Sequence, residues 1–256
     1  MFENKISIII ATYNSEKTIE MCLVSILEQN YTNFELVIID GNSYDATVEI
    51  LKKFELLFDD KLKWISEKDH GIYDAWNKGL ELTSANWVTF IGGDDFFNPN
   101  AFNNYNAQIK KNINCNFISS KNKLVNSNLK QIRIIGKPWN NKMKRYCTIA
   151  HVASLHHRKL FHNFGKFNIN YKIAGDYEFL LRCYKFINPV FTDFISATIR
   201  EGGIGMRNAK KINREIINAK KSNFTQNYFL IYYNAFLMRI KFNIRQILYK
   251  FNIKIS

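Results

Sequence analysis

The chain has 256 residues, of which 46% are hydrophobic and 23% charged. This length and balance indicate one or two globular domains with a buried core, and exclude a disordered tail, a collagen-like rod and a disulfide-stabilised miniprotein. The formal net charge is +14, and residues 207–256 carry +10 of it, with 11 basic residues and one acid. A cationic tail on a nearly neutral body predicts an anionic partner for the tail.

The four cysteines, Cys22, Cys115, Cys147 and Cys183, are scattered and show no zinc-binding spacing. They predict a reducing, cytosolic setting. The N-terminus runs straight into a strand-like segment, so we expect no signal peptide. The longest charge-free stretch of the tail, residues 222–238, has 17 residues and includes Asn, Thr and Gln. A spanning helix needs roughly 20 mostly apolar residues, so we expect no transmembrane helix.

Strands and helices are expected to alternate through the first third of the chain. Strands are predicted at 5–10, 35–40, 62–65 and 87–91, where apolar, often β-branched runs occur. Helical spacing is shown by Ile19, Leu23, Ile26 and Leu27, by Val48, Leu51, Phe54 and Leu57, and by residues 72–84. Ser15 is a possible N-cap of the first helix. The alternation predicts βαβ units on a parallel sheet, with right-handed crossovers.

The pattern becomes less regular after residue 98. Strands are expected near 115–119, 130–135 and 190–199, a helix over 176–187, and a glycine loop at 201–203. We therefore predict an α/β domain over 1–206, with halves 1–98 and 99–206, followed by a basic helical tail over 207–256.

Ligands of an open parallel sheet bind beyond the carboxyl ends of its strands. The residues predicted there are Thr12-Tyr13-Asn14, Asp40, Ser66 to Asp69 and Gly92 to Asp95. Three of these four groups contain carboxylates, while GxGxxG and P-loop motifs are absent. Such an edge suits a metal-bound diphosphate, because Mg²⁺ and Mn²⁺ prefer oxygen ligands. The alternatives are that the Asp94-Asp95 pair only forms a turn and that Asp40 only caps a helix.

Three segments occur in an order that resembles family 2 glycosyltransferases: SIIIATYN, ELVIIDGNSYDAT and SEKDHGIYDAWNKGLELTSANWVTFIGGDD. The resemblance is dense over about residues 5–98 and thinner to about 206. It points to bacterial members that build surface polysaccharides of O-antigen and colanic-acid type. It implies a GT-A fold, which is a Rossmann-like α/β domain that binds nucleotide-diphosphate sugars, here with a basic C-terminal helical extension.

The resemblance also implies which residues bind the donor. These are Thr12, Tyr13, Asn14, Asp40, Asp69, Asn77, Lys78 and Asp94. Asp40 would accept a hydrogen bond from the base, and Lys78 would act as a point charge near the diphosphate. The alternative for Lys78 is an exposed helix cation.

A metal site is implied at Asp94 and Asp95, which would hold Mn²⁺ or Mg²⁺. Gly92 stands where the family's acidic motif often begins with Asp, which puts in doubt any sugar or ribose contact made by that carboxylate. His151 is expected to contact the diphosphate or metal, with a structural histidine as the alternative. His156 and His157 are interpreted as structural.

The catalytic candidate is Asp176, because residues 172–179, KIAGDYEF, resemble the family's second acidic motif. An inverting transfer needs a base that takes the proton of the acceptor hydroxyl. The alternative is that Asp176 is only a helix N-cap, and Glu178 is a weaker candidate base. Residues 161–167 resemble the acceptor-side segment, and residues 201–204 resemble a loop that folds over the donor.

The tail interleaves basic residues with aromatic and aliphatic ones, which is typical of helices that bind an anionic membrane surface. A helical pair packed on the domain with a solvated cationic face is the alternative. No nucleic-acid motif accompanies the charge, so nucleic acid is not expected as a partner.

The predicted function is inverting transfer of a hexose or N-acetylhexosamine from a nucleotide-diphosphate sugar, expected to be a UDP-sugar, to a lipid-linked or growing surface glycan. The expected location is the cytoplasmic face of the membrane. One alternative is a non-catalytic sugar-nucleotide-binding relative, supported by Gly92. Another is a sugar nucleotidyltransferase, which would need a glycine- and Arg/Lys-rich loop where Thr12-Tyr13-Asn14 stands.

Overall fold

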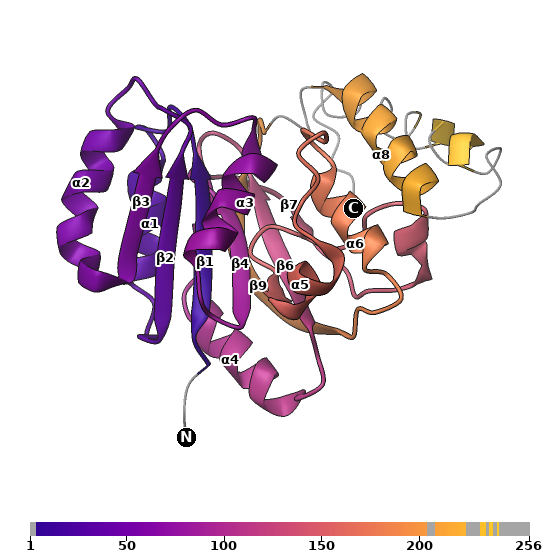
Figure 1. The fold of residues 1–256 in the computed structure, drawn as a ribbon, viewed down its shortest axis with the longest axis horizontal. Helices are drawn as coiled ribbons and strands as arrows, with labels where there is room; N and C mark the ends of the chain where they lie inside the picture. The colour runs from indigo at the N-terminus through magenta and orange to yellow at the C-terminus, as the bar shows by residue number, and fades with distance from the viewer. Residues whose placement is uncertain (1–3, 204–207, 224–230, 234–235, 238–239, 241–256) are drawn as a thin grey trace.

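The computed structural model describes residues 4–203, 208–223, 231–233, 236–237 and 240 (Figure 1). Its strands are β1 (Ile6–Thr12), β2 (Phe34–Asp40), β3 (Leu62–Ser66), β4 (Trp87–Gly92), β5 (Phe96–Phe97), β6 (Phe117–Val125), β7 (Gln131–Ile135), β8 (Leu155–His157) and β9 (Pro189–Arg200). Its α-helices are α1 (Ile19–Leu27), α2 (Thr47–Phe58), α3 (Ile72–Leu82), α4 (Ala101–Lys111), α5 (Lys159–Phe164), α6 (Gly175–Arg182) and α8 (Ala209–Asn223). Two short 3-10 helices are η1 (Asp59–Lys61) and η2 (Asn141–Lys144).

The N-terminal half is the predicted parallel sheet. The strands lie in the order β3-β2-β1-β4, and each neighbouring pair is parallel. Thr12 lies opposite Asp40 in the register, and Ala11 lies opposite Gly92. The carboxyl ends of β1, β2 and β4 therefore lie at one edge, where a ligand is expected.

The second half extends the same sheet with mixed strand directions. β8 pairs antiparallel with β4 and β6, and β9 runs parallel to β6. The short strand β5 pairs antiparallel with the end of β9, where Phe96 lies opposite Thr198. This pairing brings the end of β9 next to the segment that follows β4. The sequence did not predict β5, because a strand of two residues has no periodicity to detect.

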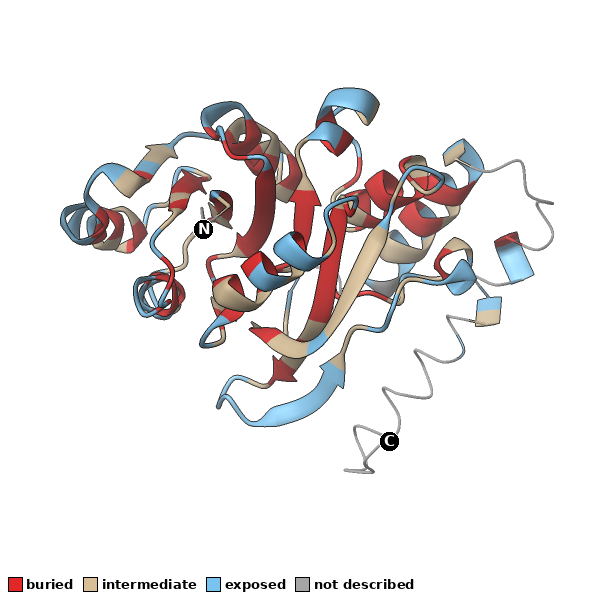
Figure 2. Cartoon of the chain, turned by 90° about the horizontal axis from the view of Figure 1, so that it is seen from below, coloured by how far each residue is buried: buried red, intermediate tan, exposed pale blue. Residues whose placement is uncertain are grey.

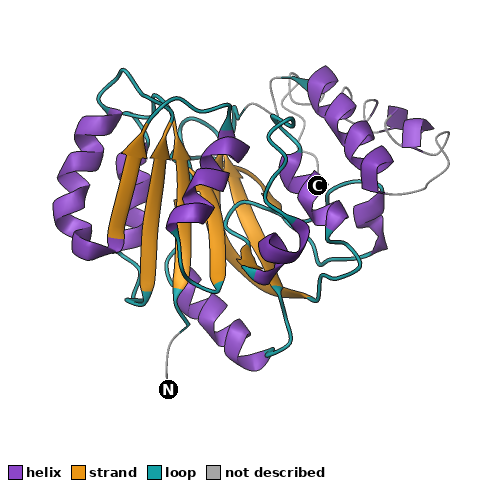
Figure 3. Cartoon of the chain, in the orientation of Figure 1, coloured by secondary structure: helices purple, strands orange, loops and turns teal. Residues whose placement is uncertain are grey.

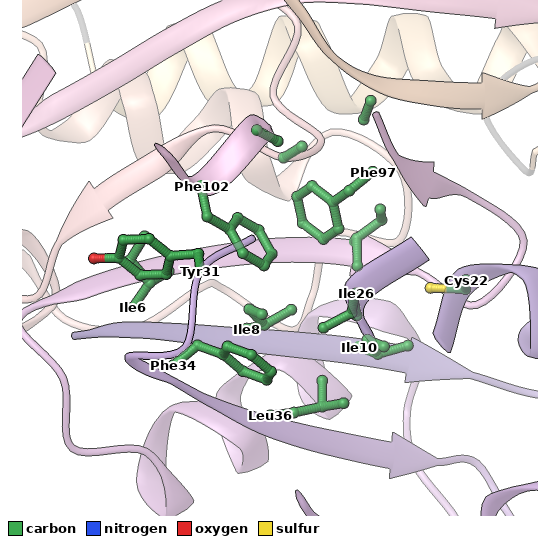
Figure 4. Packing of buried hydrophobic residues seen from close by; sticks show 14 of the residues in the cluster. Ile6, Ile8, Ile10, Cys22, Ile26, Tyr31, Phe34, Leu36, Phe97 and Phe102 are labelled. Atoms are coloured by element: carbon green, nitrogen blue, oxygen red, sulfur yellow. The ribbon is translucent and has the colours of Figure 1, made fainter. Parts of the chain in front are cut away.

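Helices cover both faces of the sheet (Figure 3). Successive residues of a strand point to opposite faces, and β1 follows this rule. Ile6, Ile8 and Ile10 lie in one cluster with residues of α1, α2 and α4. Figure 4 labels Cys22 and Ile26 of α1 and Phe102 of α4 in this cluster. Ile9 packs on the other face with residues of α3 and α6. The strand is thus buried from both sides, as its continuous apolar run predicts, and buried residues concentrate in the central strands (Figure 2).

The helices differ from the predicted pattern at three places. α1 begins at Ile19, because the carbonyl of Ser15, and not its hydroxyl, accepts hydrogen bonds from the amides of Thr18 and Ile19. Leu57 is 62% exposed, since α2 directs Phe58 inward in its place. α6 ends at Arg182 and leaves Phe186 63% exposed in the turn that follows.

Helix α8, in the described part of the tail, lies against the domain. Ile216 and Ala219 of α8 are buried in the same cluster as residues of α3 and α6. This is the packing that the alternative interpretation of the tail predicts for these residues. The domain boundary at residue 206 stays a prediction. Among the described residues, no helix is both long enough and apolar enough to cross a membrane.

Candidate donor and catalytic site

The loops that follow β1 and β2 are tied together at the edge of the sheet. The Asn14 amide donates to Ser43 Oγ at 2.8 Å, and the Tyr44 amide donates to Asn14 Oδ1 at 3.1 Å. Tyr13 is 58% exposed and Tyr44 is 84% exposed, and their rings meet edge to face with centroids 6.3 Å apart. Tyr44 is not among the residues predicted from the sequence, although its place four residues after a buried strand is a signal for the same edge. The two rings form an exposed aromatic corner.

Asp40 is fully buried. Its Oδ2 accepts hydrogen bonds from the Ser43 amide at 2.9 Å and from Ser66 Oγ at 2.6 Å, and its Oδ1 accepts from Ser43 Oγ. The carboxylate therefore shapes the loop after β2. In this structure it is not open to a base, so the contact predicted from the sequence would require Ser43 or Ser66 to move.

Asp69 lies at the same edge as the aromatic corner. Its Oδ1 accepts a hydrogen bond from the Gly71 amide at 2.7 Å. Its Oδ2 would lie 2.9 Å from a Cβ atom built on Gly41, and the Tyr13 ring would lie 3.3 Å from the same atom. A glycine at position 41 therefore allows the close approach that brings Asp69 and Tyr13 together.

Asn77 and Lys78 make other contacts than predicted. Asn77 binds the backbone of Phe167 with both its polar atoms, at 2.8 and 3.0 Å, so it joins α3 to the acceptor-side segment. Lys78 forms an ion pair with Glu67 at 2.6 Å and donates to the Lys68 carbonyl at 3.0 Å. Burial alone would lower the pKa of Lys78, but the Glu67 carboxylate raises it. The charge of Lys78 is thus already compensated inside the protein.

Asp94 is exposed, whereas Asp95 is 6% exposed. Asp95 Oδ1 accepts a hydrogen bond from the Arg200 amide at 2.9 Å, and Arg200 Nε donates to the Asp94 carbonyl at 2.8 Å. The end of β9 thereby fixes the acidic segment. Burial and the neighbouring Asp94 carboxylate raise the pKa of Asp95 well above its ordinary value.

The two carboxylates converge on the space left by a missing side chain. A Cβ atom built on Gly92 would lie 2.6 Å from Asp94 Oδ1 and 3.8 Å from Asp95 Oδ2. The absence of a side chain at position 92 therefore makes room for Asp94. Two carboxylate oxygens around one space fit a hard divalent cation, which takes its other ligands from substrate phosphates and water.

His151 does not complete a metal site with this pair. Its Nδ1 lies 3.9 Å from Asp176 Oδ2, and its ring stacks on Trp76. Within the described ranges, no group of three or more His, Cys, Asp or Glu residues could hold a metal ion. The three-residue ligand set predicted from the sequence is therefore corrected, because tertiary packing brings His151 to Asp176.

Asp176 is held by one of its oxygens. Oδ1 accepts hydrogen bonds from the Tyr177 amide at 2.8 Å and from the Tyr73 hydroxyl at 3.1 Å. Oδ2 faces His151, and the side chain is 27% exposed. The N-cap of α6 is Ala174, so Asp176 is not the N-cap. A partly exposed carboxylate with a fixed orientation can accept a proton.

The groups around Asp176 stay neutral at ordinary pH. Burial lowers the pKa of His151, although the Asp176 carboxylate opposes this. Burial and the Asp176 carboxylate raise the pKa of Tyr73 well above its ordinary value. Glu178, the weaker candidate base, is 5% exposed and paired with Arg182 at 2.9 Å, so it has a structural partner.

The remaining predicted residues are two histidines, the acceptor-side segment and the glycine loop. Burial lowers the pKa of His156 well below its ordinary value, and His157 Nδ1 accepts a hydrogen bond from the Lys159 amide at 3.2 Å, as structural histidines do. Residues 161–167 contribute the buried rings of Phe161 and Phe167 to the cluster that also contains Tyr73 and Tyr177. The loop at 201–203 follows β9, and Ile204 lies outside the described residues.

The sequence of the chain matches known glycosyltransferases. The model of Glycosyl transferase family 2 matches residues 7–170. A PGL/p-HBAD biosynthesis glycosyltransferase of Mycobacterium bovis is 30% identical over 184 residues, which are 72% of this chain and 70% of that protein.

Two solved structures resemble the chain in fold. The mannosyltransferase PcManGT from Pyrobaculum calidifontis, in complex with GDP-Man and Mn²⁺, matches with a TM-score of 0.68 at 16% identity, covering 93% of this chain and 70% of that one. S. aureus TarS 1–349 in complex with UDP-GlcNAc matches with a TM-score of 0.67 at 21% identity, covering 89% and 69%. The chain spans 41% of the longer TarS structure. The family model and the mycobacterial relative show that the chain belongs to glycosyl transferase family 2, and the structural neighbours show that it has the GT-A fold.

Proposed function

We propose that this protein is a metal-dependent, inverting hexosyltransferase. It transfers a hexose or N-acetylhexosamine from a nucleotide-diphosphate sugar to a hydroxyl of a lipid-linked or growing surface glycan, of the O-antigen type. The observation that carries the proposal is the Asp176 carboxylate, whose Oδ1 accepts two hydrogen bonds while Oδ2 lies 3.9 Å from His151 Nδ1 and the side chain stays 27% exposed. A UDP-sugar is the proposed donor, because TarS of similar fold has been solved with UDP and with UDP-GlcNAc.

The donor would bind along the edge formed by Tyr13, Asn14, Tyr44 and Asp69. The exposed rings of Tyr13 and Tyr44 offer an apolar surface to the base, and Asp69 offers an acceptor for hydroxyl groups. Thr12 Oγ1 lies just below, buried without a hydrogen-bond partner. Asp94 and Asp95 would hold Mn²⁺ or Mg²⁺, which neutralises the charge of the departing diphosphate when bound.

Asp176 would act as the general base. Its carboxylate takes the proton of the acceptor hydroxyl while that oxygen attacks the anomeric carbon. The bond from the anomeric carbon to the diphosphate oxygen breaks, and the nucleoside diphosphate leaves with the bonding electron pair. A single displacement of this kind inverts the configuration at the anomeric carbon. Tyr73 orients the carboxylate in this step, since its hydroxyl donates to Asp176 Oδ1.

Peripheral attachment to the cytoplasmic membrane surface is the proposed location. Glu215, Ile216, Ala219 and Lys220 of α8 are buried against the domain. The exposed residues of α8 include Lys210, Lys211, Arg214 and Lys221. Basic residues near an anionic surface each contribute roughly 1 kcal/mol to binding, so this outward face favours the leaflet where a lipid-linked acceptor would lie.

The test is a transfer and hydrolysis assay with a panel of sugar nucleotides, including UDP-GlcNAc, with and without Mn²⁺. We expect metal-dependent release of nucleoside diphosphate from one member of the panel, and inverted configuration in the transferred sugar. Tight donor binding without release would favour the non-catalytic alternative. Formation of a nucleotide-sugar from a sugar phosphate and a nucleoside triphosphate would favour the nucleotidyltransferase.

A further inference from the structure

We propose that Glu215 of α8 is a positioning residue for Asp176. This inference rests on the proposed role of Asp176 as base. Glu215 is the single acid of residues 207–256, which otherwise carry only basic charges. Its side chain is buried, with 8% exposed, although it lies in the basic C-terminal segment.

Glu215 binds the backbone that leads into α6. Its Oε1 accepts a hydrogen bond from the Lys172 amide at 3.0 Å. Its Oε2 accepts from the amides of Ile173 at 2.8 Å and Ala174 at 2.9 Å, and lies 3.1 Å from that of Lys172. Three successive amides thus converge on one carboxylate, which fixes the backbone two residues before Asp176.

α6 has no side-chain cap of its own. Its N-cap position is Ala174, which cannot accept a hydrogen bond through its side chain. Amides at the start of a helix need acceptors, and a carboxylate there is favoured by charge-assisted hydrogen bonds and by the helix dipole. From a helix that lies far away in the sequence, Glu215 supplies a carboxylate to the amides of residues 172–174, which lead into α6 and end at its N-cap position.

The same backbone segment is coupled to Asp176 through Tyr73. The Tyr73 hydroxyl lies 2.8 Å from the Ile173 carbonyl and 3.1 Å from Asp176 Oδ1. Glu215 therefore holds the amide of Ile173, while the Tyr73 hydroxyl shares its single proton between the Ile173 carbonyl and Asp176 Oδ1. A Cβ atom built on Gly175 would lie 2.8 Å from the Tyr73 ring, so the backbone and the ring are in close contact. Loss of the Glu215 carboxylate should shift this segment and change the direction of Asp176.

α8 is anchored well enough to serve as the support. Ile216 and Ala219 lie in the hydrophobic cluster shared with α6. Lys220 is 1% exposed, and its Nζ donates to the Arg145 carbonyl. Burial lowers the pKa of Lys220 to about 8, as is typical of an ammonium group held in a dry contact.

The test compares Glu215→Gln and Glu215→Ala with Ile216→Ala in the full chain. Ile216→Ala removes buried surface from the same helix and leaves the carboxylate in place. With the donor found in the panel assay, we expect kcat to fall about 100-fold in Glu215→Ala, the scale of a misplacement near 1 Å. The KM for the donor should stay unchanged, because the donor edge is formed by other loops. In Glu215→Gln, one oxygen remains as an acceptor, so its loss of kcat should be smaller. Ile216→Ala should lower thermal stability and keep kcat.

Two further measurements separate positioning from general support. Hydrogen exchange of the amides of residues 172–174 should accelerate in both Glu215 variants and not in Ile216→Ala. In an Asp176→Asn background, Glu215→Gln should cause no further loss of kcat, since residues that act through one group are not additive.

Unchanged kcat in Glu215→Gln and Glu215→Ala would overturn the inference, as would equal loss of kcat in Ile216→Ala or additive losses with Asp176→Asn. If Glu215→Ala does not fold, Glu215→Gln supplies the same comparisons. If the unaltered chain turns over no donor, the proposed function fails, whereas accelerated exchange at residues 172–174 would still show that Glu215 holds this segment.

Discussion

Replacing Asp176 with Asn separates the proton-accepting role of this side chain from its structural contacts. Asn has the same shape, and its carbonyl oxygen can still accept the hydrogen bonds from the Tyr177 amide and the Tyr73 hydroxyl, which are 2.8 and 3.1 Å long. The free energy of unfolding should therefore change by only about 1 kcal/mol, the usual value for one altered hydrogen bond.

The expected effect on turnover is much larger. A positioned general base contributes about 10²–10⁴ in rate, which corresponds to about 2.7–5.4 kcal/mol of activation free energy. We expect kcat to fall by this factor while nucleotide affinity, measured by calorimetry with UDP, stays unchanged. Glu178→Gln is the matched control, because Glu178 lies on the same helix but pairs with Arg182. It should reduce stability and keep most of the turnover.

Three results would refute this reasoning. One is near-normal turnover in Asp176→Asn. Another is an equal loss of turnover in Glu178→Gln. The third is a loss of turnover explained by unfolding, which thermal denaturation of the variant would detect.

EDTA should abolish transfer and added Mn²⁺ should restore it, whereas Asp95→Asn should show no response to Mn²⁺; full activity in a chelated assay would contradict the metal site. Gly92→Ala should weaken activation by Mn²⁺, because its Cβ would lie 2.6 Å from Asp94 Oδ1 and displace that carboxylate; unchanged Mn²⁺ titrations would contradict this. Burial would raise the pKa of Glu35, but hydrogen bonds from its neighbours lower it to about 2 from 4.5. Its stabilisation is therefore present above pH 4.5 and lost as the pH falls toward 2, so Glu35→Gln should flatten the acid limb of a stability–pH curve. Changing the four exposed basic residues of α8 to Gln should reduce sedimentation with anionic vesicles at low salt, and equal sedimentation would count against membrane attachment through this face.

The local sequence pattern was enough to predict the parallel half of the fold. The run Ile8, Ile9 and Ile10 is apolar without a break, as required for a strand covered on both faces, and this burial was confirmed. The alternation of strands and helices then indicates a parallel sheet, because parallel strands need crossover connections. The position of Asp94 and Asp95 after a strand, next to two glycines, was predictable for the same local reason.

Other assignments depended on contacts between distant segments. The polar atoms of Asn77 form hydrogen bonds with the backbone of Phe167, ninety positions away in the chain. His151 is directed to Asp176, and Asp40 is enclosed by Ser43 and Ser66. A motif shows which residue types are present, but hydrogen-bond partners decide which of their polar atoms remain available to a ligand.

The sequence by itself determined the alternation of strands and helices in the first half, the family resemblance and the acidic residues of the site, because these depend on periodicity and on residues close together in the chain. Only the tertiary structure decided that β9 returns to fix Asp95 through the Arg200 amide, and that α8 places Glu215 against the start of α6. The physical reason is that a buried carboxylate is stable where several donors converge on it, and those donors come together only when the chain is folded.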